Sequence, residues 1–227
     1  MSHAGRLTAP RHILRAAPEA IAAFADAPVG NIVDALGRSG AMTSEVRPMT
    51  RATRFAGTAL PVDAGPRDNL APWAALRLAR PGDVLVIGTG GYTAASVCGD
   101  LMVGMARNAG IVAVVTDGAI RDVDGSDRVG IPVFAAAVSP NSPQKDGPGS
   151  VGLPVVVGSV VVAPGDIVCG DGDGVVVIPA ARIGEATAAL AQVRAKEVEM
   201  EAAVRDGRTA PAWLAGLPLD EIFRFVE

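Results

Sequence analysis

The chain has 227 residues, a length that suits one compact domain with a sizeable buried core. Hydrophobic residues make up 49% of it and aromatic residues only 4%, so the core must be built from Val, Ile, Leu and Ala, as in buried α/β sheets. The net charge of −4 without clustered Lys and Arg argues against a nucleic-acid partner, and no apolar run reaches the roughly 20 residues of a membrane span.

Hydrophobic periodicity predicts alternating helices and strands through the first two thirds of the chain. Helices are expected over residues 18–26, 30–38, 69–79 and 98–110, and a short polar helical turn over 119–130. Strands are expected over residues 54–64, 81–88 (with a leading turn), 111–118 and 131–138. Such alternation is typical of α/β proteins.

The pattern changes after a Pro- and Gly-rich loop at residues 139–150. Short Val-rich segments between Gly, Pro and Asp turns predict a β-meander over residues 154–179. Residues 180–206 predict a long charged helix, followed by a short amphipathic piece. We expect residues 1–17 to be mobile and residues 18–227 to form one domain with a C-terminal helical extension. The whole pattern favours a layered α/β sandwich over a simple doubly wound sheet.

Scarce residue types exclude several mechanisms. The two histidines, His3 and His12, lie in the segment expected to be mobile, whereas a Ser-His-Asp or Cys-His mechanism needs a fixed imidazole. The two lysines, Lys145 and Lys196, lie in a turn-rich loop and a charged run, which disfavours a desolvated Schiff-base lysine. Two cysteines, of which Cys98 is expected to be a buried thiol, predict no disulfide framework and a cytoplasmic protein. A metal site would therefore use carboxylates, carbonyls and water, which suits Mg²⁺ or Mn²⁺.

The most informative local arrangement joins a predicted helix start to the end of the following strand. Asp100 opens the helix, and Arg121 and Asp122 come just after the strand at 111–118, so the two carboxylates can meet where α/β sheets commonly bind ligands. The free N–H groups of Leu101 and Met102 would add an anion-binding surface. On spacing alone, a surface turn with Asp100 acting as a helix cap is the alternative.

Two carboxylates beside an arginine suit the chemistry of pyruvate-type 2-oxo acids. A divalent metal can chelate the keto and carboxylate oxygens of such an acid. Carbon–carbon cleavage then leaves a pyruvate enolate, which the metal and Arg121 would stabilise.

At these residues the sequence resembles the RraA-like class II pyruvate aldolases, also called 4-hydroxy-4-methyl-2-oxoglutarate aldolases. Asp100, Arg121 and Asp122 match the family's Asp, twenty residues, Arg-Asp motif. The resemblance covers roughly residues 30–207 through the segments NIVDALGR, RDNLAPWAAL, PGDVLVI, VVTDGAIRD, GIPVFA and PGDIVCGDGDGVVVIP. It implies a β/β/α sandwich like the phosphohistidine swivelling domain, assembled as a homotrimer or a hexamer with sites between subunits.

The resemblance also implies roles for individual residues. Asp122 would ligate Mg²⁺ or Mn²⁺, and Asp100 would hold a water of the metal. A glutamate from the neighbouring subunit would complete the water shell; Glu197 is the first candidate, with Glu199 and Glu201 next. The pyruvate part of the substrate would be bound at the helix start and by the arginine, through Gly99, Leu101, Met102 and Arg121.

The chain departs from the family pattern at two positions. Gly125 stands where an acidic residue is common, so Asp124 could replace that residue or the metal shell could be thinner. Arg67 replaces a glycine, either at the pocket rim or facing solvent. Asn69 and Asp34 could support the pocket from behind, or they could be capping and turn residues.

Two functions from different classes follow. The first is a divalent-metal-dependent lyase that cleaves 4-hydroxy-2-oxo acids, including those with a 4-methyl or 4-carboxy substituent, to pyruvate and a second oxo acid, and that also decarboxylates oxaloacetate. The alternative is a non-catalytic RraA-like regulator that binds an RNA-degrading endonuclease. Such regulators typically lack the Asp after the Arg, so Asp122 favours catalysis.

Overall fold

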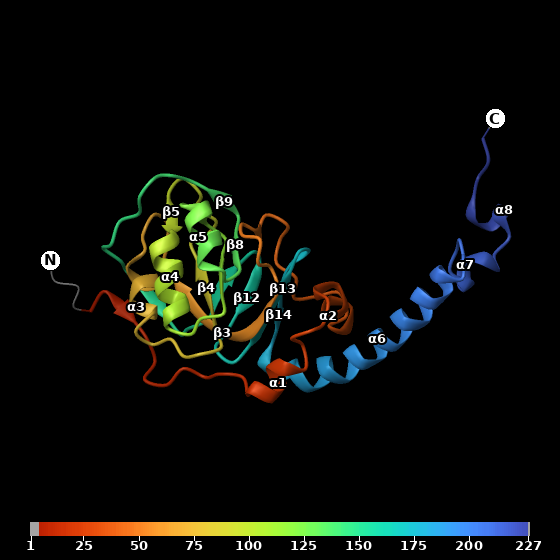
Figure 1. Cartoon of the computed structure of the whole chain (residues 1–227), viewed down its shortest axis with the longest axis horizontal. Coiled ribbons are helices and arrows are strands. Elements are labelled where there is room, and N and C mark those ends of the chain that lie inside the picture. Colours follow the sequence, from red (N-terminus) through yellow and green to blue (C-terminus); the bar gives the residue numbers. More distant parts are fainter. Residues whose placement is uncertain (1–4, 227) are drawn as a thin grey trace.

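A computed structural model describes residues 5–226, with a layered body and a C-terminal helical arm that leaves it (Figure 1). The largest sheet has nine strands, whose path runs β1-β10-β3-β4-β6-β8-β2, with β13 joined to β3 and β14 joined to β13. Its strands are β1 (Leu7–Thr8), β2 (Arg47–Pro48), β3 (Phe55–Asp63), β4 (Asp83–Gly88), β6 (Ala113–Thr116), β8 (Val133–Ala135), β10 (Gly149–Val151), β13 (Ile167–Asp171) and β14 (Gly174–Ile178).

Among residues 5–226, two smaller sheets and eight α-helices complete the body and the arm. A three-stranded parallel sheet contains β5 (Ser96–Cys98), β7 (Ala119–Ile120) and β9 (Ala137–Val138), and an antiparallel hairpin contains β11 (Val155–Val157) and β12 (Val160–Val162). The helices are α1 (Pro18–Ala22), α2 (Val29–Ala35), α3 (Leu70–Ala75), α4 (Asp100–Asn108), α5 (Val123–Val129), α6 (Ile183–Arg205), α7 (Ala212–Ala215) and α8 (Leu219–Ile222), with a 3₁₀ turn η1 (Ala180–Arg182) before α6.

The central strand β4 shows why the body is layered. All its residues are buried, and successive side chains of a strand point to opposite faces. Leu85 and Ile87 pack with helices α3 and α4 on one face, while Val84 and Val86 pack with the β11–β12 hairpin on the other. The sheet is therefore covered on both sides, and the predicted layered α/β architecture is confirmed.

Several predicted boundaries differ from the structure. The segment predicted as one meander forms two separate hairpins, because β12 pairs only with β11 while β13 pairs with β14 and β3. The segment predicted as one strand over residues 131–138 is split at Ala136, so β8 and β9 belong to different sheets. The loop predicted at 139–150 ends in β10, which pairs with β3 and β1. The helices predicted at 18–26, 30–38 and 69–79 are all shorter, and the helix predicted at 180–206 is confirmed as η1 and α6.

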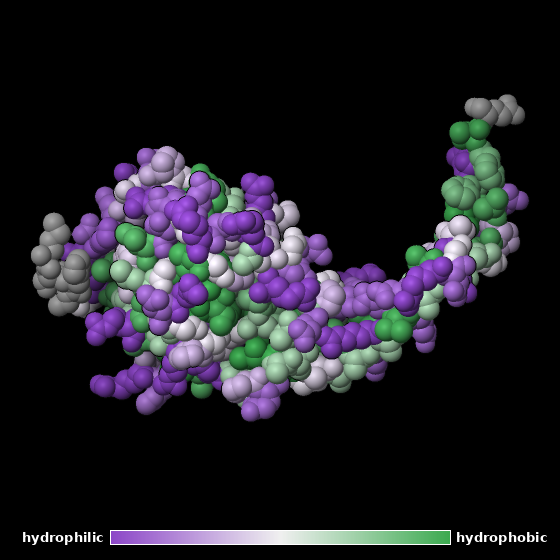
Figure 2. All heavy atoms as spheres, in the orientation of Figure 1, coloured by the Kyte–Doolittle hydropathy of each residue, from purple (hydrophilic) through white to green (hydrophobic). Residues whose placement is uncertain are grey.

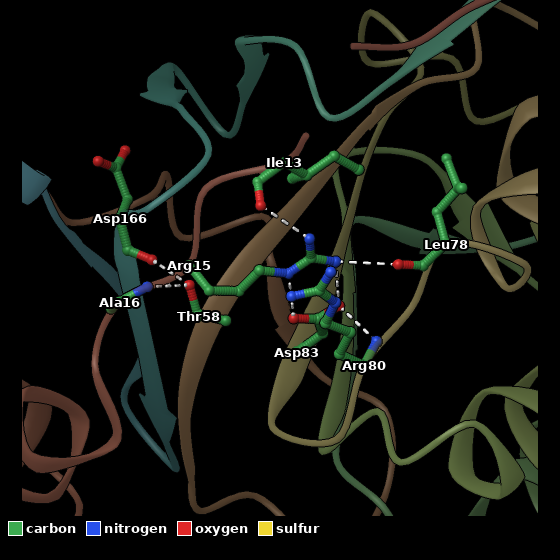
Figure 3. A network of polar contacts seen from close by, with 8 residues as sticks. All are labelled: Ile13, Arg15, Ala16, Thr58, Leu78, Arg80, Asp83 and Asp166. Atoms are coloured by element: carbon green, nitrogen blue, oxygen red, sulfur yellow. Dashed lines mark hydrogen bonds and ion pairs between the residues drawn. The ribbon is translucent and has the colours of Figure 1, made fainter. Parts of the chain in front are cut away.

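Part of the N-terminal segment, for which mobility is expected over residues 1–17, makes contacts with the body. Arg15 donates from Nε and Nη2 to the carboxylate of Asp83 at 3.1 and 2.9 Å, and Ala16 N–H donates to Thr58 Oγ1 at 2.9 Å (Figure 3). The Asp83 side chain is fully buried, and β1 adds a short parallel pairing to β10. The first four residues, among them His3, lie outside the described part of the chain.

The arm is formed by α6 to α8. Within α6 only Ala186 and Leu190 are buried, both in its first half, and the rest of the helix extends away from the sheet (Figure 1). Exposed hydrophobic side chains gather toward the far end of the arm (Figure 2), among them Val204, Trp213 and Phe225. Among residues 5–226, no helix combines the length and hydrophobicity that crossing a membrane requires.

Candidate active site

The candidate site forms where two neighbouring parallel strands end. Cys98 at the end of β5 pairs with Ile120 at the end of β7, and Arg121 N–H donates to the Cys98 carbonyl at 3.0 Å. This pairing brings the start of α4, with Asp100, next to Arg121 and Asp122. The predicted convergence is therefore present, but its cause differs: β7 of the small sheet carries Arg121 and Asp122, rather than the long strand predicted at 111–118.

A glycine allows the two strand exits to approach each other. A Cβ atom on Gly99 would lie 2.5 Å from Asp122 Oδ2 and 3.1 Å from Arg121 Cγ, so no larger residue fits without moving the site. Asp122 has left-handed backbone angles, φ 52° and ψ 46°, and occupies the N-cap position of α5. Aspartate tolerates this conformation better than most residues, and such strain is often found at functional sites.

Arg121 is oriented by two contacts. Its Nε donates to Asp122 Oδ2 at 3.2 Å, and its Nη1 donates to Ser142 Oγ at 2.9 Å. The side chains of Arg121 and Asp122 are 39% and 45% exposed, so both can still reach a ligand. Nη2 has no hydrogen-bond partner among the described residues, which leaves donors for an anionic group.

The start of α4 offers backbone donors. Gly99 is its N-cap residue and no side chain caps the helix there, so the first N–H groups, including those of Leu101 and Met102, lack intrahelical partners. Asp100 lies in the first turn, half-buried against α5. A helix start with free N–H groups attracts a carboxylate.

The space around position 125 accounts for the glycine that stands where the family pattern has an acidic residue. A Cβ atom at Gly125 would lie 2.3 Å from Asp100 Oδ2, so the Asp100 carboxylate occupies the space that a side chain would need. Asp124 is exposed and does not line the cavity at the site. It does not replace the missing acidic residue in the wall of this cavity.

These groups surround a cavity of about 100 Å³. Pockets for drug-sized ligands start at about 300 Å³, so this chain alone accommodates a small molecule. The wall is formed by Asn69, Trp73, Ser96, Cys98, Gly99, Asp100, Leu101, Met102, Arg121, Asp122, Ser142, Pro143 and Lys145.

The wall contains residues that the sequence did not single out as part of a site. Ser142, Pro143 and Lys145 come from the loop after β9, which shows no periodicity. Asp68 Oδ2 fixes this loop by accepting hydrogen bonds from the N–H groups of Asp146 and Gly147 at 2.7 and 3.1 Å. Lys145 is exposed, as expected of a loop lysine, but it stands at the cavity rim.

Asn69 and Cys98 lie in the wall, and Arg67 does not. The Cys98 side chain is buried, and burial raises the pKa of its thiol to about 12. It therefore stays protonated at neutral pH, as expected for a buried thiol without a nearby base. His12 is exposed on the N-terminal segment, and Arg67 is exposed to solvent.

Asp34 and Glu197 do not reach this cavity within one copy of the chain. They line a separate groove of about 740 Å³ between α2 and α6, where the amide of Asn31 donates to the Glu197 carboxylate. Asp34 is exposed, so it does not support the cavity of its own chain from behind.

The donor set of the cavity fits a hard divalent cation. Within residues 5–226, no group of three or more His, Cys, Asp or Glu residues could hold a metal ion. The cavity has two carboxylates, Asp100 and Asp122, and its only thiol is protonated. Mg²⁺ usually keeps several waters and binds one or two carboxylates, so this set suits Mg²⁺ or Mn²⁺.

Comparisons with known proteins identify relatives of the whole chain. A Halalkalibacterium halodurans protein with the provisional name 4-hydroxy-4-methyl-2-oxoglutarate aldolase is 36% identical over 185 residues, which cover 82% of this chain and 87% of that protein. The crystal structure of Streptomyces coelicolor RraAS2, described as an unusual member of the RNase ES inhibitor RraA protein family, has a TM-score of 0.73 and 26% identity. The match covers 82% of this chain and 98% of that one.

A structure from Pseudomonas syringae pv. tomato shares the fold, with a TM-score of 0.75 and 24% identity over 86% of this chain and 96% of that one. The RraA-like family pattern, described as Aldolase/RraA, matches residues 29–177. The chain therefore belongs to the RraA-like family.

Proposed function

We propose that this protein is a divalent-metal-dependent lyase that cleaves 4-hydroxy-2-oxo acids, including 4-methyl- and 4-carboxy-substituted ones, to pyruvate and a second oxo acid. The observation that carries the proposal is the junction of Gly99, Arg121 and Asp122. It joins free backbone donors, a partly exposed guanidinium and a carboxylate in one small cavity. The aldolase name of the Halalkalibacterium relative supports the same reaction class.

Each residue of the cavity has its own role in this proposal. The N–H groups of Leu101 and Met102 bind the substrate carboxylate, and Arg121 donates hydrogen bonds to the oxygen that becomes negatively charged when the carbon–carbon bond breaks. Asp122 would ligate Mg²⁺ or Mn²⁺, and Asp100 would hold a water of its shell. When bound, the cation supplies Lewis-acid polarisation of the 2-oxo group. Oxaloacetate decarboxylation would proceed at the same groups, because it also yields the pyruvate enolate.

A second copy of the chain completes the site in this proposal. With two carboxylates in the cavity, a bound Mg²⁺ would keep several waters that a further carboxylate could hold, and Glu197 lies on the arm, which extends beyond its own body. We assign residues 18–227 to one catalytic domain and infer that α6 of one copy brings Glu197 to the cavity of the next. A homotrimer or a hexamer of two trimers provides this arrangement.

The test is a pyruvate-release assay with 4-hydroxy-4-methyl-2-oxoglutarate and with oxaloacetate, in Mg²⁺ and in EDTA. We expect turnover that requires Mg²⁺, a loss of at least about 100-fold in Asp122→Asn, and near-normal turnover in the matched control Asp173→Asn, an exposed aspartate in the β13–β14 turn. Turnover that persists in EDTA would contradict the metal requirement.

The second candidate is a regulator that binds an RNA-degrading endonuclease, favoured by the fold shared with Streptomyces coelicolor RraAS2. Absence of both turnover and Mg²⁺ binding in the folded protein would replace the lyase proposal with this one.

A further inference from the structure

Lys145 lines the candidate cavity at its rim, and its side chain is exposed to solvent. Its ammonium group forms no ion pair with any described residue, although the carboxylates of Asp100 and Asp122 line the same cavity. A lysine ammonium is positively charged at neutral pH, and its three N–H groups can only donate hydrogen bonds. Lys145 is therefore a cation at the mouth of the cavity that no described acidic residue neutralises.

The backbone on both sides of Lys145 is fixed. Gln144 N–H donates and Gln144 O accepts backbone hydrogen bonds at 2.8 and 3.0 Å, both with the segment that precedes α3. Asp68, which is 8% exposed, accepts at Oδ2 from Asp146 N–H at 2.7 Å. The carboxylate of Asp146 lies 3.6 Å from Nη1 of Arg6, so this acidic neighbour already has a cationic partner. The loop thus holds the Cα of Lys145 at the rim, while the flexible side chain can adjust to a ligand.

The other donors of the cavity already have roles in the proposed reaction. The N–H groups at the start of α4 bind the first carboxylate of the substrate. Arg121 is oriented by Asp122 and Ser142 at 3.2 and 2.9 Å, and it donates to the oxygen that becomes charged. Because the cavity measures only about 100 Å³, the part of the acid beyond carbon 3 lies at the rim. A free cation at the rim attracts an anionic group on that part of the acid.

We propose that Lys145 pairs with a second carboxylate, which carbon 4 of the substrate carries. It thereby selects dicarboxylic 4-hydroxy-2-oxo acids, such as 4-hydroxy-4-methyl-2-oxoglutarate, over monocarboxylic ones. This inference rests on the proposed function. Lys145 exchanges no proton with the reacting carbons in this scheme, so it is a specificity-determining residue.

The ion pair acts on binding more than on the chemical step. When the bond between carbons 3 and 4 breaks, the second carboxylate stays on the second oxo acid, so its charge is the same before and after cleavage. An interaction that is equally strong in the bound substrate and in the transition state lowers KM and leaves kcat unchanged. Loss of the Lys145 ammonium should therefore raise KM for a dicarboxylic acid and change kcat little.

The test compares two acids in the full-length protein with Mg²⁺. The first is 4-hydroxy-4-methyl-2-oxoglutarate, and the second is 4-hydroxy-4-methyl-2-oxopentanoate, in which a methyl group replaces the second carboxylate. We expect the unmodified protein to have a kcat/KM at least about 10-fold higher for the dicarboxylic acid, as for one hydrogen bond to a charged group. In Lys145→Ala this value should fall about 10-fold, mainly through KM, while the value for the monocarboxylic acid changes less than about threefold.

Lys145→Arg is the matched control, because it keeps the positive charge, and it should stay within about threefold of the unmodified protein on both acids. Raising the salt concentration from about 0.1 M to about 1 M shortens the screening length from about 10 Å to about 3 Å. KM for the dicarboxylic acid should therefore rise more in the unmodified protein than in Lys145→Ala. Thermal melting and calorimetric titration with Mg²⁺ check that both variants fold and keep their affinity for the cation. An acid that is not cleaved is measured as a competitive inhibitor of oxaloacetate turnover.

A selective loss on the dicarboxylic acid in Lys145→Ala, with the preference retained in Lys145→Arg, supports the inference. Equal kcat/KM of the unmodified protein for the two acids, or equal changes on both acids in Lys145→Ala, overturns it while leaving the proposed function standing. A loss in Lys145→Arg as large as that in Lys145→Ala also overturns it, because the charge is then not what matters. If the unmodified protein releases pyruvate from neither acid nor from oxaloacetate, the proposed function itself fails and this inference with it.

Discussion

Replacing Gly99 with alanine tests whether the close approach of the two strand exits matters. The added Cβ would lie 2.5 Å from Asp122 Oδ2 and 3.3 Å from Arg121 Nε, whereas unstrained contacts of a carbon atom lie at about 3.5 Å or more. The Asp122 carboxylate must therefore move by about 1 Å. The φ of Gly99 is −143°, an extended value that alanine adopts freely, so the effect acts on the site rather than on the backbone.

Misplacing a reacting group by about 1 Å can lower activity about 100-fold, and we expect kcat/KM for pyruvate release to fall by this amount in Gly99→Ala. Stability should change little, because both displaced side chains are partly exposed and can move toward solvent. The matched control is Gly104→Ala in the same helix, where the nearest atom to the new Cβ is Val129 Cγ2 at 3.9 Å. It should keep its activity and gain about 0.5–1 kcal/mol of stability, because alanine favours helices.

The assay combines steady-state kinetics, calorimetric titration with Mg²⁺ and urea unfolding of both variants. Activity of Gly99→Ala within about threefold of the unmodified protein, with unchanged Mg²⁺ affinity, would refute the reasoning, because a 1 Å shift should cost far more. Equal losses in both variants would assign the effect to α4 as a whole.

Other predictions concern the contact between Arg15 and Asp83, the thiol of Cys98, and Gly125 in α5. Arg15→Ala removes the two hydrogen bonds, at 3.1 and 2.9 Å, that Arg15 donates to the fully buried Asp83 carboxylate, and leaves it the one from Arg80 N–H. Because the buried charge loses its cationic partner, the free energy of unfolding in urea should fall by about 3 kcal/mol; a loss below about 1 kcal/mol would contradict this. Because burial raises the pKa of Cys98 from 9.0 to about 12, the native thiol should resist iodoacetamide at pH 8, as mass spectrometry can show, and rapid labelling would contradict its burial. The raised pKa of Cys98 also stabilises the folded state. This contribution is fully present below the unfolded pKa and is lost as the pH rises toward 12, so the free energy of unfolding in urea should fall across this range. Gly125→Ala places a Cβ 2.3 Å from Asp100 Oδ2 and should lower pyruvate release at least about tenfold; normal turnover would show that the position of Asp100 is not critical.

Local patterns in the sequence were sufficient for much of the fold. Unbroken apolar runs bounded by turns predicted β3 and β4, and the Gly stop after residue 109 predicted the end of α4. These signals are local, because side-chain alternation and turn preference depend on a few neighbouring residues. For the candidate site, the sequence predicted that Asp100, Arg121 and Asp122 lie close together, since a helix start and a strand exit can be read from the chain itself.

Pairing between distant segments was decided only by the tertiary structure. Arg15 and Asp83 are 68 positions apart in the sequence, and Arg121 and Ser142 are 21 positions apart. No local sequence pattern predicts either contact. The separation of β11–β12 from β13–β14 likewise depends on β13 pairing with β3, more than a hundred residues earlier. Contacts of this kind follow from packing the whole chain.

The same division holds inside the site. The sequence by itself determined which chemical groups are available: two carboxylates and an arginine near one another in the predicted map, with only two histidines and two lysines in the whole chain. Only the tertiary structure decided that the loop with Ser142 and Lys145 lines the cavity, that Asn69 Oδ1 is buried without a hydrogen-bond partner among the described residues, and that Glu197 lies elsewhere in its own copy. The physical reason is that residue types define what chemistry is possible, whereas the position of a side chain depends on contacts between segments far apart in the chain.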